Sequence, residues 1–181
     1  TVQGLYDNYW RTTYAAIWNI NDMVSAAETE GLDAYVAAGK IFKAFYTATL
    51  TELWIDVPAS KAGLGTGNTT PTYDKQQAIY TEVLADLKEA NTLWAGSAGF
   101  VAGGDVLFNG DVTRWQKLAN SLRLRYLLRL SNRTEVNASI EIATIVGDPA
   151  TYPIVTSNAD AGFYDFSGVS PDVSSFSVQV T

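Results

Sequence analysis

The hydrophobic and polar positions of this chain follow the spacing of amphipathic helices. The clearest case lies between Asp111 and Ser131, where hydrophobic side chains return every three or four residues. At about 100° per residue they form one stripe, which consists of Trp115, Leu118, Ala119, Leu122, Tyr126 and Leu130. Three further leucines cover the opposite face, and a helix that is hydrophobic on most sides needs neighbours on most sides. We therefore predict that helix 113–131 is a central member of a helical layer.

Four other segments repeat this spacing and predict further helices. They cover residues 5–28, 34–53, 75–94 and 135–146. Gly31 follows the first of them, as glycine commonly does at a helix C-terminus. Asp33 is a suitable N-cap for the second helix, and Thr72 or Asp74 for the third. Pro58 favours an extended conformation in the residue before it and therefore ends the second helix.

These helices predict an all-α fold built from antiparallel helix pairs, 5–28 with 34–53 and 75–94 with 113–131. Paired helices stacked in sequence resemble a tetratricopeptide-like solenoid, although no consensus repeat of about 34 residues is present. We expect a helical domain over residues 1–149 and a loop-rich, irregular segment over 150–181. In that segment Phe176, Val178 and Val180 alternate with polar residues. This alternation predicts a short strand, and we expect the natural sequence to continue beyond it.

The composition excludes several classes of function. The chain carries 12 Lys and Arg against 19 Asp and Glu, a net charge of −7, which argues against nucleic-acid binding. Cysteine and histidine are both absent, so disulfides, thiolate nucleophiles, Ser-His-Asp triads and zinc mechanisms are excluded. No acidic pair stands out as a glycosidase pair, and the acidic turn at 105–111 lacks the spacing of an EF-hand. We predict no catalytic residue, no cofactor and no metal site.

Charged residues inside hydrophobic stripes predict an ion pair. Arg129 lies within the stripe of the central helix, and Arg125 lies at its edge. Glu52 lies in the middle of the stripe of the second helix. Because a buried guanidinium is costly without a carboxylate, we expect a buried ion pair between Glu52 and one of these arginines. The competing acids are Asp22, Asp56 and Asp86. The alternative is that the arginines extend to the edge of the layer and bury only their stems.

Aromatic residues near predicted loops are the candidates for ligand contact. The chain has five Trp and ten Tyr, and aromatic faces suit the apolar faces of sugar rings as well as a helical core. Trp54, Tyr73 and Trp94 lie near loops, while Asp56 and Asn68 are candidates for hydrogen bonds to a ligand. For each aromatic residue the alternative is packing in the core or closure of a helix end.

Four segments of the chain carry a family resemblance. They read YDNYWRTTYAAIWNINDMV, LTELWIDVP, PTYDKQQAIYTEVLADLKEA and NGDVTRWQKLANSLRLRYLLRLS. The last is the most specific, with Asn109-Gly110-Asp111, Trp115 and the run Asn120-Ser121-Leu122-Arg123-Leu124-Arg125. In this order they resemble the SusD/RagB-like family, in particular its branch of starch-binding-associated outer-membrane lipoproteins. The resemblance runs from about Tyr6 to about Pro149 and covers roughly a third of a usual family member, or one domain of a larger protein.

The resemblance implies a non-enzymatic, surface-exposed lipoprotein of the cell outer membrane that binds glycans. Such a protein captures oligosaccharides for a partner TonB-dependent outer-membrane transporter, with tetratricopeptide-like helix pairs as its scaffold. The lipid-bearing cysteine of the family is absent, so we expect any anchor to precede Thr1. Two positions depart from the family pattern, since Ile55 stands where a glycine is usual and Glu52 where an aspartate is usual.

A second hypothesis belongs to a different class of protein. Helical-pair scaffolds also serve as adaptors that bind a protein or a peptide and no sugar, and a fold alone does not decide between these functions. Flanking sequence with a lipidated cysteine would favour the glycan-binding protein, whereas cytosolic flanking sequence would favour the adaptor.

Overall fold

The computed structural model describes residues 2–101, 103–162 and 166–169. Within them the α-helices are α1 (Val2–Glu30), α2 (Asp33–Trp54), α3 (Gln76–Gly96), α4 (Val112–Arg129) and α5 (Ala138–Gly147). Short 3-10 helices cover Gly65–Gly67, Thr134–Val136 and Asn158–Asp160. These residues contain no β-strand, and an isolated antiparallel bridge joins Val57 to Asp74. The all-α prediction is confirmed, whereas the expected strand at 176–180 lies outside the described residues.

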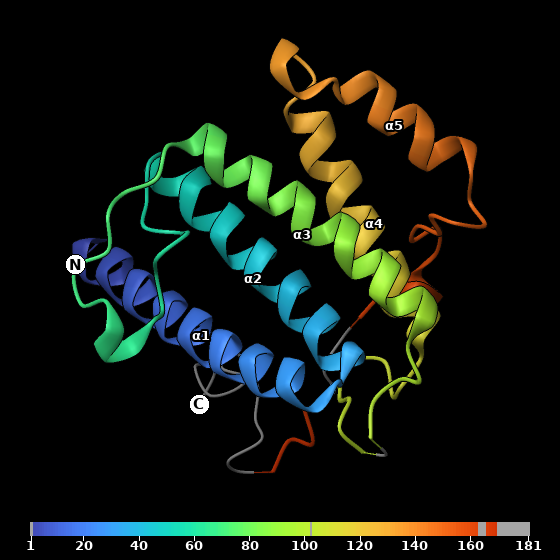
Figure 1. The fold of residues 1–181 in the computed structure, drawn as a ribbon, viewed down its shortest axis with the longest axis horizontal. Coiled ribbons are helices and arrows are strands. Elements are labelled where there is room, and N and C mark those ends of the chain that lie inside the picture. The colour runs from blue at the N-terminus through green and yellow to red at the C-terminus, as the bar shows by residue number, and fades with distance from the viewer. Residues whose placement is uncertain (1, 102, 163–165, 170–181) are drawn as a thin grey trace.

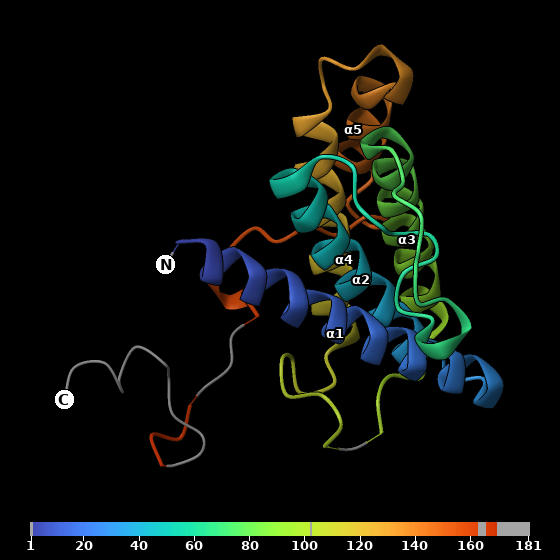
Figure 2. The same ribbon diagram turned by 90° about the vertical axis from the view of Figure 1, so that its left-hand side faces the viewer.

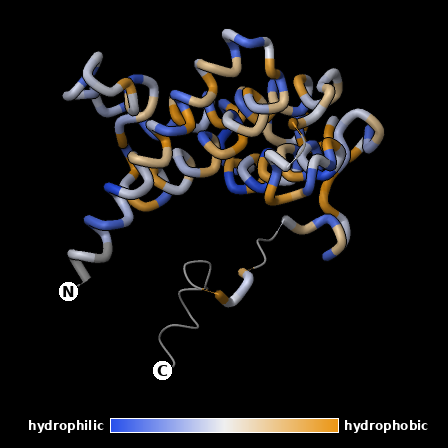
Figure 3. Tube along the Cα trace, turned by 90° about the horizontal axis from the view of Figure 1, so that it is seen from below, coloured by the Kyte–Doolittle hydropathy of each residue, from blue (hydrophilic) through white to orange (hydrophobic). Residues whose placement is uncertain are grey.

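The helices stack in the order of the sequence. Each of α1 to α4 packs against the next, and α5 packs against α4 (Figures 1 and 2). Hydrophobic and hydrophilic positions alternate along each helix (Figure 3), as the spacing in the sequence predicts. The antiparallel helix pairs and their tetratricopeptide-like stack are therefore confirmed. Among the described residues, no helix combines the length and hydrophobicity that crossing a membrane requires.

Small residues on α2 let its neighbours approach closely. Ala37, Ala44 and Ala48 are almost completely buried, and small side chains at a helix contact shorten the distance between the two axes. Gly39 extends this surface toward α1, because a Cβ atom at Gly39 would collide with the side chain of Val24. The alanine-rich stripe of the sequence therefore corresponds to the most tightly packed helix of the layer.

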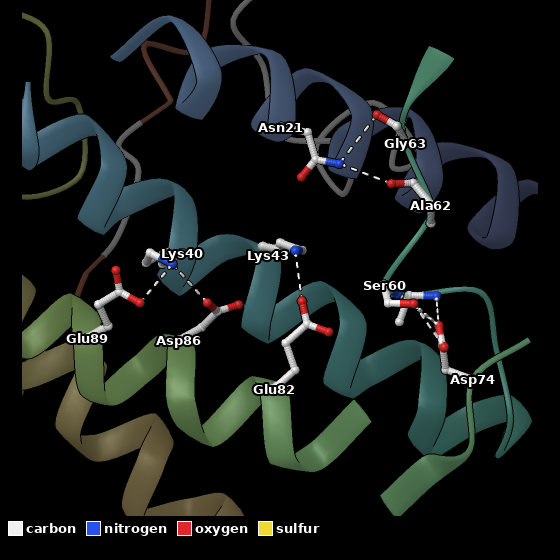
Figure 4. A network of polar contacts seen from close by, with 11 residues as sticks. Asn21, Lys40, Lys43, Ser60, Ala62, Gly63, Asp74, Glu82, Asp86 and Glu89 are labelled. Atoms are coloured by element: carbon white, nitrogen blue, oxygen red, sulfur yellow. Dashed lines mark hydrogen bonds and ion pairs between the residues drawn. The ribbon is translucent and has the colours of Figure 1, made fainter. Parts of the chain in front are cut away.

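A polar seam follows the contact between α2 and α3. Lys40 pairs with Asp86 and Glu89, each at 3.1 Å, and Lys43 pairs with Glu82 at 3.0 Å (Figure 4). Asp86 is one of the acids predicted to compete for the arginines on α4. Because Asp86 pairs with Lys40, it is not the partner of those arginines. The seam also sets the alignment of α2 against α3, since a shift along either helix would separate several charges at once.

The loop between α2 and α3 is held by two aspartates. Asp74 accepts hydrogen bonds from the backbone N–H groups of Ala59 (2.9 Å) and Ser60 (2.8 Å), so it closes the loop and does not cap α3 (Figure 4). Asp56 instead accepts from the N–H of Gln76 at 3.0 Å, in the first turn of α3. The predicted cap at Asp74 is wrong because the returning chain brings Asp56 to the helix start.

The starts of α2 and α4 are capped in different ways, and that of α2 differs from the predicted Asp33 cap. Asp33 lies inside the first turn of α2, and Leu32 occupies the cap position without a side-chain hydrogen bond. At the start of α4, Asp111 accepts a hydrogen bond from the N–H of Arg114 at 3.1 Å and caps the helix. Asp33 still contributes, because a negative charge in the first turn interacts favourably with the helix dipole.

Ile55 ends α2 in a backbone conformation that usually requires glycine. Its φ is 68° and its ψ is −92°, close to the strained γ-turn conformation that β-branched residues rarely adopt. The N–H of Ile55 donates to the carbonyl of Thr51 at 2.9 Å, and its side chain is 64% exposed. The turn therefore forms with isoleucine at position 55, where the SusD/RagB-like family that the sequence resembles usually has glycine.

We expect Ile55→Gly to raise the free energy of unfolding by about 1 kcal/mol. Relief of a strained non-glycine conformation is worth about 1–3 kcal/mol, and the greater freedom of glycine in the unfolded chain offsets about 0.4–1 kcal/mol of it. Urea unfolding followed by circular dichroism would measure the change. Ile55→Ala is the matched control, since it removes the exposed side chain but keeps a Cβ atom. Equal stability of the Ile55→Gly and Ile55→Ala variants would show that the strain has no energetic weight.

Candidate functional site

Aromatic side chains gather where α1 begins and α2 ends, and we call this group the aromatic patch. It consists of Tyr6, Tyr9, Trp10, Tyr14 and Trp54. The Trp54 ring lies 5.1 Å from that of Trp10 and 6.3 Å from those of Tyr6 and Tyr9, centre to centre. Tyr6 is 50% exposed and Trp54 is half-buried. Tyr6 is therefore the most exposed member of the patch, while Trp10, Tyr14 and Trp54 are partly buried against the core.

Tyr14 anchors the inner edge of the aromatic patch. Its hydroxyl donates a hydrogen bond to the carbonyl of Pro58 at 2.7 Å, which fixes the loop after α2 to α1. Burial raises the pKa of Tyr14 well above its usual range, and the nearby Tyr73 and Asp74 raise it further. Because Tyr73 contributes to this shift in the pKa of Tyr14, the two side chains lie close enough to interact electrostatically. The Tyr73 side chain is 65% exposed. The structure thus brings Trp54 and Tyr73 to the same end of the helical stack.

The two polar candidates for ligand contact are engaged within the protein. Asp56 accepts from Lys75 Nζ at 2.6 Å as well as from the start of α3, and the hydrogen bond from Lys75 is the main cause that lowers its pKa. Asn68 donates to the carbonyl of Lys61 at 3.2 Å and stabilises the loop. Both side chains therefore have structural roles near the patch, with part of their hydrogen-bonding capacity left over.

Trp94 does not belong to this site. Its side chain is only 1% exposed and stacks on Trp115 at 5.5 Å with an angle of 15° between the rings. It lies near the C-terminus of α3, whereas Trp54 lies at the end of the antiparallel α2, so the two occupy opposite ends of the layer (Figure 1). Trp94 therefore packs in the core, the alternative expected for each aromatic candidate, because Phe100 and Trp115 lie against its indole ring.

Glu52 forms an ion pair with Arg129, the last residue of α4. The hydroxyl of Tyr80 also donates to Glu52 Oε1 at 3.2 Å. Arg125 does not join the pair, and its guanidinium lies 6.0 Å from the centre of the Tyr126 ring. The Arg129 side chain is 44% exposed, so the expected burial is wrong. An exposed pair of this kind stabilises by about 0–1 kcal/mol, because water already solvates the guanidinium.

The buried arginine of α4 is instead Arg123. Its side chain is 3% exposed and pairs with Glu141 from α5. Sequence reasoning missed this pair, because Arg123 lies off the main hydrophobic stripe and only the position of α5 encloses it. One signal was present, since Glu141 falls on the same face of its helix as Ala138 and Ile145. A carboxylate on a hydrophobic face indicates a partner.

The polar residues of α4 fasten a later segment, 151–160, to the helices. Asn120 is completely buried, and its Nδ2 donates to Asn91 Oδ1 at 2.8 Å and to the carbonyl of Pro153 at 3.0 Å. Ser121 Oγ accepts from the N–H of Val155 at 2.8 Å. The Asn-Ser-Leu-Arg run, which carries the family resemblance, therefore has a structural role: it binds the returning chain and α5.

Lys117 and Asp160 complete this attachment. Lys117 Nζ lies 2.6 Å from Asp160 Oδ1, and Asp160 also accepts from the N–H of Thr156 at 3.2 Å. The hydrogen bond from Lys117 is the main cause that lowers the pKa of Asp160 from 3.8 to about 2. The carboxylate therefore stays charged in mildly acidic solution.

We expect the stabilisation from Asp160 to depend on pH in a defined window. Its pKa is depressed in the folded chain, so the stabilisation is fully present above the unfolded pKa of 3.8 and is lost as the pH falls toward about 2. Urea unfolding of the natural chain and of Asp160→Asn at pH 5, 4 and 3 would show a stability difference that shrinks with pH. A constant difference over this range would contradict the assigned pair.

These observations define a class of protein: a helical-stack scaffold with an exposed aromatic patch at one end. Among the described residues, no group of three or more Asp and Glu side chains could hold a metal ion. The chain belongs to the SusD-like family described as "Starch-binding associating with outer membrane", which matches residues 1–179. The family resemblance of the sequence is therefore confirmed.

Solved structures show the same relationship. A SusD homologue from Bacteroides fragilis NCTC 9343 is 34% identical, with a TM-score of 0.69 over 81% of this chain and 32% of that chain. A protein described as a "chitin-binding protein" is 35% identical, with a TM-score of 0.73 over 84% of this chain and 32% of that chain. A SusD/RagB family protein from Bacteroides thetaiotaomicron VPI-5482 is 26% identical, with a TM-score of 0.76 over 92% of this chain and 34% of that chain.

The chain thus spans about a third of the length of these structures. A search of curated proteins found no match.

Proposed function

We propose that this protein is a non-enzymatic, surface-exposed lipoprotein of the outer membrane that binds glycans. It captures oligosaccharides and presents them to a partner TonB-dependent transporter. The family description, which names starch binding and the outer membrane, supports the class of ligand and the location. A similar solved structure, described as a "chitin-binding protein", supports the same class of ligand.

The observation that carries the proposal is the exposure of the aromatic patch. An aromatic ring that is held from behind by other rings offers a rigid apolar face at little cost in side-chain entropy. Sugar rings have apolar faces of matching size, and polar groups at the edge of such a site orient them. Trp54 supplies the central ring, and Tyr6 and Tyr73 are the most exposed aromatic side chains near it.

We expect Trp54→Ala to weaken oligosaccharide binding by about tenfold or more, because truncation of a central aromatic contact commonly costs over about 1.4 kcal/mol. Maltotriose and chitotriose titrations, followed by tryptophan fluorescence and calorimetry, would measure the affinities. Trp18→Ala is the matched control, since Trp18 is 53% exposed on α1 and lies outside the patch. Circular dichroism of each variant would verify that the helices are retained.

The results would also separate this function from the other classes. Unchanged affinity after Trp54→Ala would remove the patch as the sugar site. Binding of peptides but of no glycan would support the helical adaptor instead. Release of reducing sugar from a polysaccharide, abolished by one carboxylate substitution, would show an enzyme.

A further inference from the structure

A hollow that is separate from the aromatic patch lies between α3, α4 and residues 133–141. Its volume is about 490 Å³, within the range of roughly 300–1,000 Å³ typical of small-molecule sites. Its lining comes from the N-terminal two-thirds of α3, the C-terminal half of α4 and the residues that lead into α5. Side chains that repeat every three or four residues line it, from α3 (Gln77, Thr81, Leu84, Lys88) and from α4 (Arg123, Leu127, Leu130).

The lining combines an apolar floor with polar side chains. Leu84, Leu130 and Val136 supply hydrophobic surface, while Gln77 and Thr81 supply hydrogen-bonding groups along one wall. An apolar surface beside amides and hydroxyls suits a hydroxyl-rich ring, which has both kinds of surface. The hollow is thus built like a ligand site and is separate from the aromatic patch.

The lining of this hollow contains three cations and two acids, although the chain as a whole is acidic. Lys88 and Arg133 line it, and neither has an ion-pair partner among the described residues. Arg123 is buried at its base and paired with Glu141. Glu135 is the one further acid in the lining. The unpaired Lys88 and Arg133 side chains favour a ligand that carries negative charge.

We propose that this hollow binds an acidic oligosaccharide, with carboxylates of different sugar units at Lys88 and at Arg133 and the sugar rings over Leu84 and Leu130. The inference rests on the proposed glycan-binding function and names the class of glycan, an oligosaccharide that contains uronic acid. Lysine and arginine form charge-assisted hydrogen bonds with a carboxylate, which are stronger than those between neutral groups. A neutral sugar of the same size would leave these cations without a partner.

The test compares tri-galacturonic acid with maltotriose on the full 181-residue chain by calorimetry at low and at moderate salt. We expect tri-galacturonic acid to bind more tightly at this hollow and to weaken as salt rises. The double variant Lys88→Gln/Arg133→Gln should lower that affinity by about tenfold or more, because the ligand loses charge-assisted hydrogen bonds at both positions. Both side chains are exposed, so the fold should be retained.

A matched control removes two positive charges elsewhere. Lys61→Gln/Arg125→Gln changes the net charge equally at exposed positions outside the hollow, and it should leave the affinity for tri-galacturonic acid nearly unchanged. An equal loss in both double variants would overturn the site, because the effect would then come from net charge. Sodium acetate at the same carboxylate concentration should not compete; full competition would overturn the sugar as the ligand.

The outcomes separate this inference from the proposed function. Binding of maltotriose that depends on Trp54, with no binding of tri-galacturonic acid, would overturn the acidic-sugar site and leave the glycan-binding function standing. Absence of binding to either glycan would overturn both.

Discussion

Replacing Trp115 by alanine is expected to lower the free energy of unfolding by about 3–5 kcal/mol, the range measured for large aromatic residues in protein cores. Trp115 is 2% exposed and lies on α4 where α2, α3 and the rings of Phe100 and Phe108 meet. It stacks on Trp94 and contacts Phe42, Phe100 and Phe108, with ring centres 5.1 to 5.6 Å apart. Its removal therefore leaves a cavity bordered by four aromatic rings.

The same substitution removes a hydrogen bond. The indole Nε1 of Trp115 donates to Asp105 Oδ2 at 2.8 Å. Asp105 also accepts from the N–H groups of Leu107, Phe108 and Gly110, so it organises the turn that leads into α4. Although burial works to raise the pKa of Asp105, these hydrogen bonds, with that from Trp115 the largest, lower it overall. Loss of the indole should therefore loosen this turn as well as the core.

Urea unfolding of Trp115→Ala, Trp115→Phe and Trp18→Ala would test this account. The phenylalanine variant keeps part of the ring packing and loses the hydrogen bond, so its stability should lie between those of the natural chain and the alanine variant. Trp18 is half exposed, and its replacement should change stability by about 0.5 kcal/mol or less. Equal effects at positions 18 and 115 would contradict the assigned core.

Replacing Asn120 by alanine is expected to destabilise the chain by about 2–4 kcal/mol. The amide of Asn120 satisfies the buried Asn91 Oδ1 and the part-buried carbonyl of Pro153, and each buried group left without a partner costs about 1–3 kcal/mol. Asn91 in turn donates to the carbonyl of Thr151 at 3.2 Å. The loss should therefore spread to the whole attachment of segment 151–160.

Two measurements would separate the global effect from the local one. Urea unfolding gives the stability, and limited proteolysis of residues 151–160 gives the attachment of the segment. The control is Ser121→Ala, because the N–H of Val155 that Ser121 binds belongs to an exposed residue and can turn to water. It should cost about 1 kcal/mol or less. Rapid cleavage in the natural chain would contradict the attachment.

The sequence by itself determined the helices and their order. Hydrophobic spacing located α1 to α5 to within a few residues at most ends, because the buried face of a helix repeats with the period of the helix itself. Alanines on α2 indicated close packing, and segments such as the Asn-Ser-Leu-Arg run indicated the family. These signals are local, since each depends on neighbours within one helix.

The tertiary structure alone decided which charged and aromatic residues meet. Trp54 and Trp94 have similar settings in the sequence, yet one ends at an exposed patch and the other under α4. Arg129 lies on the hydrophobic stripe but at the last turn, where water reaches it, whereas α5 encloses Arg123. Burial and pairing depend on neighbours that are distant in the sequence. The residues of one helix therefore do not indicate which other segments will cover that helix. The helix 113–131 was thus predictable as an element, while its partners, including segment 151–160, were decided by the fold.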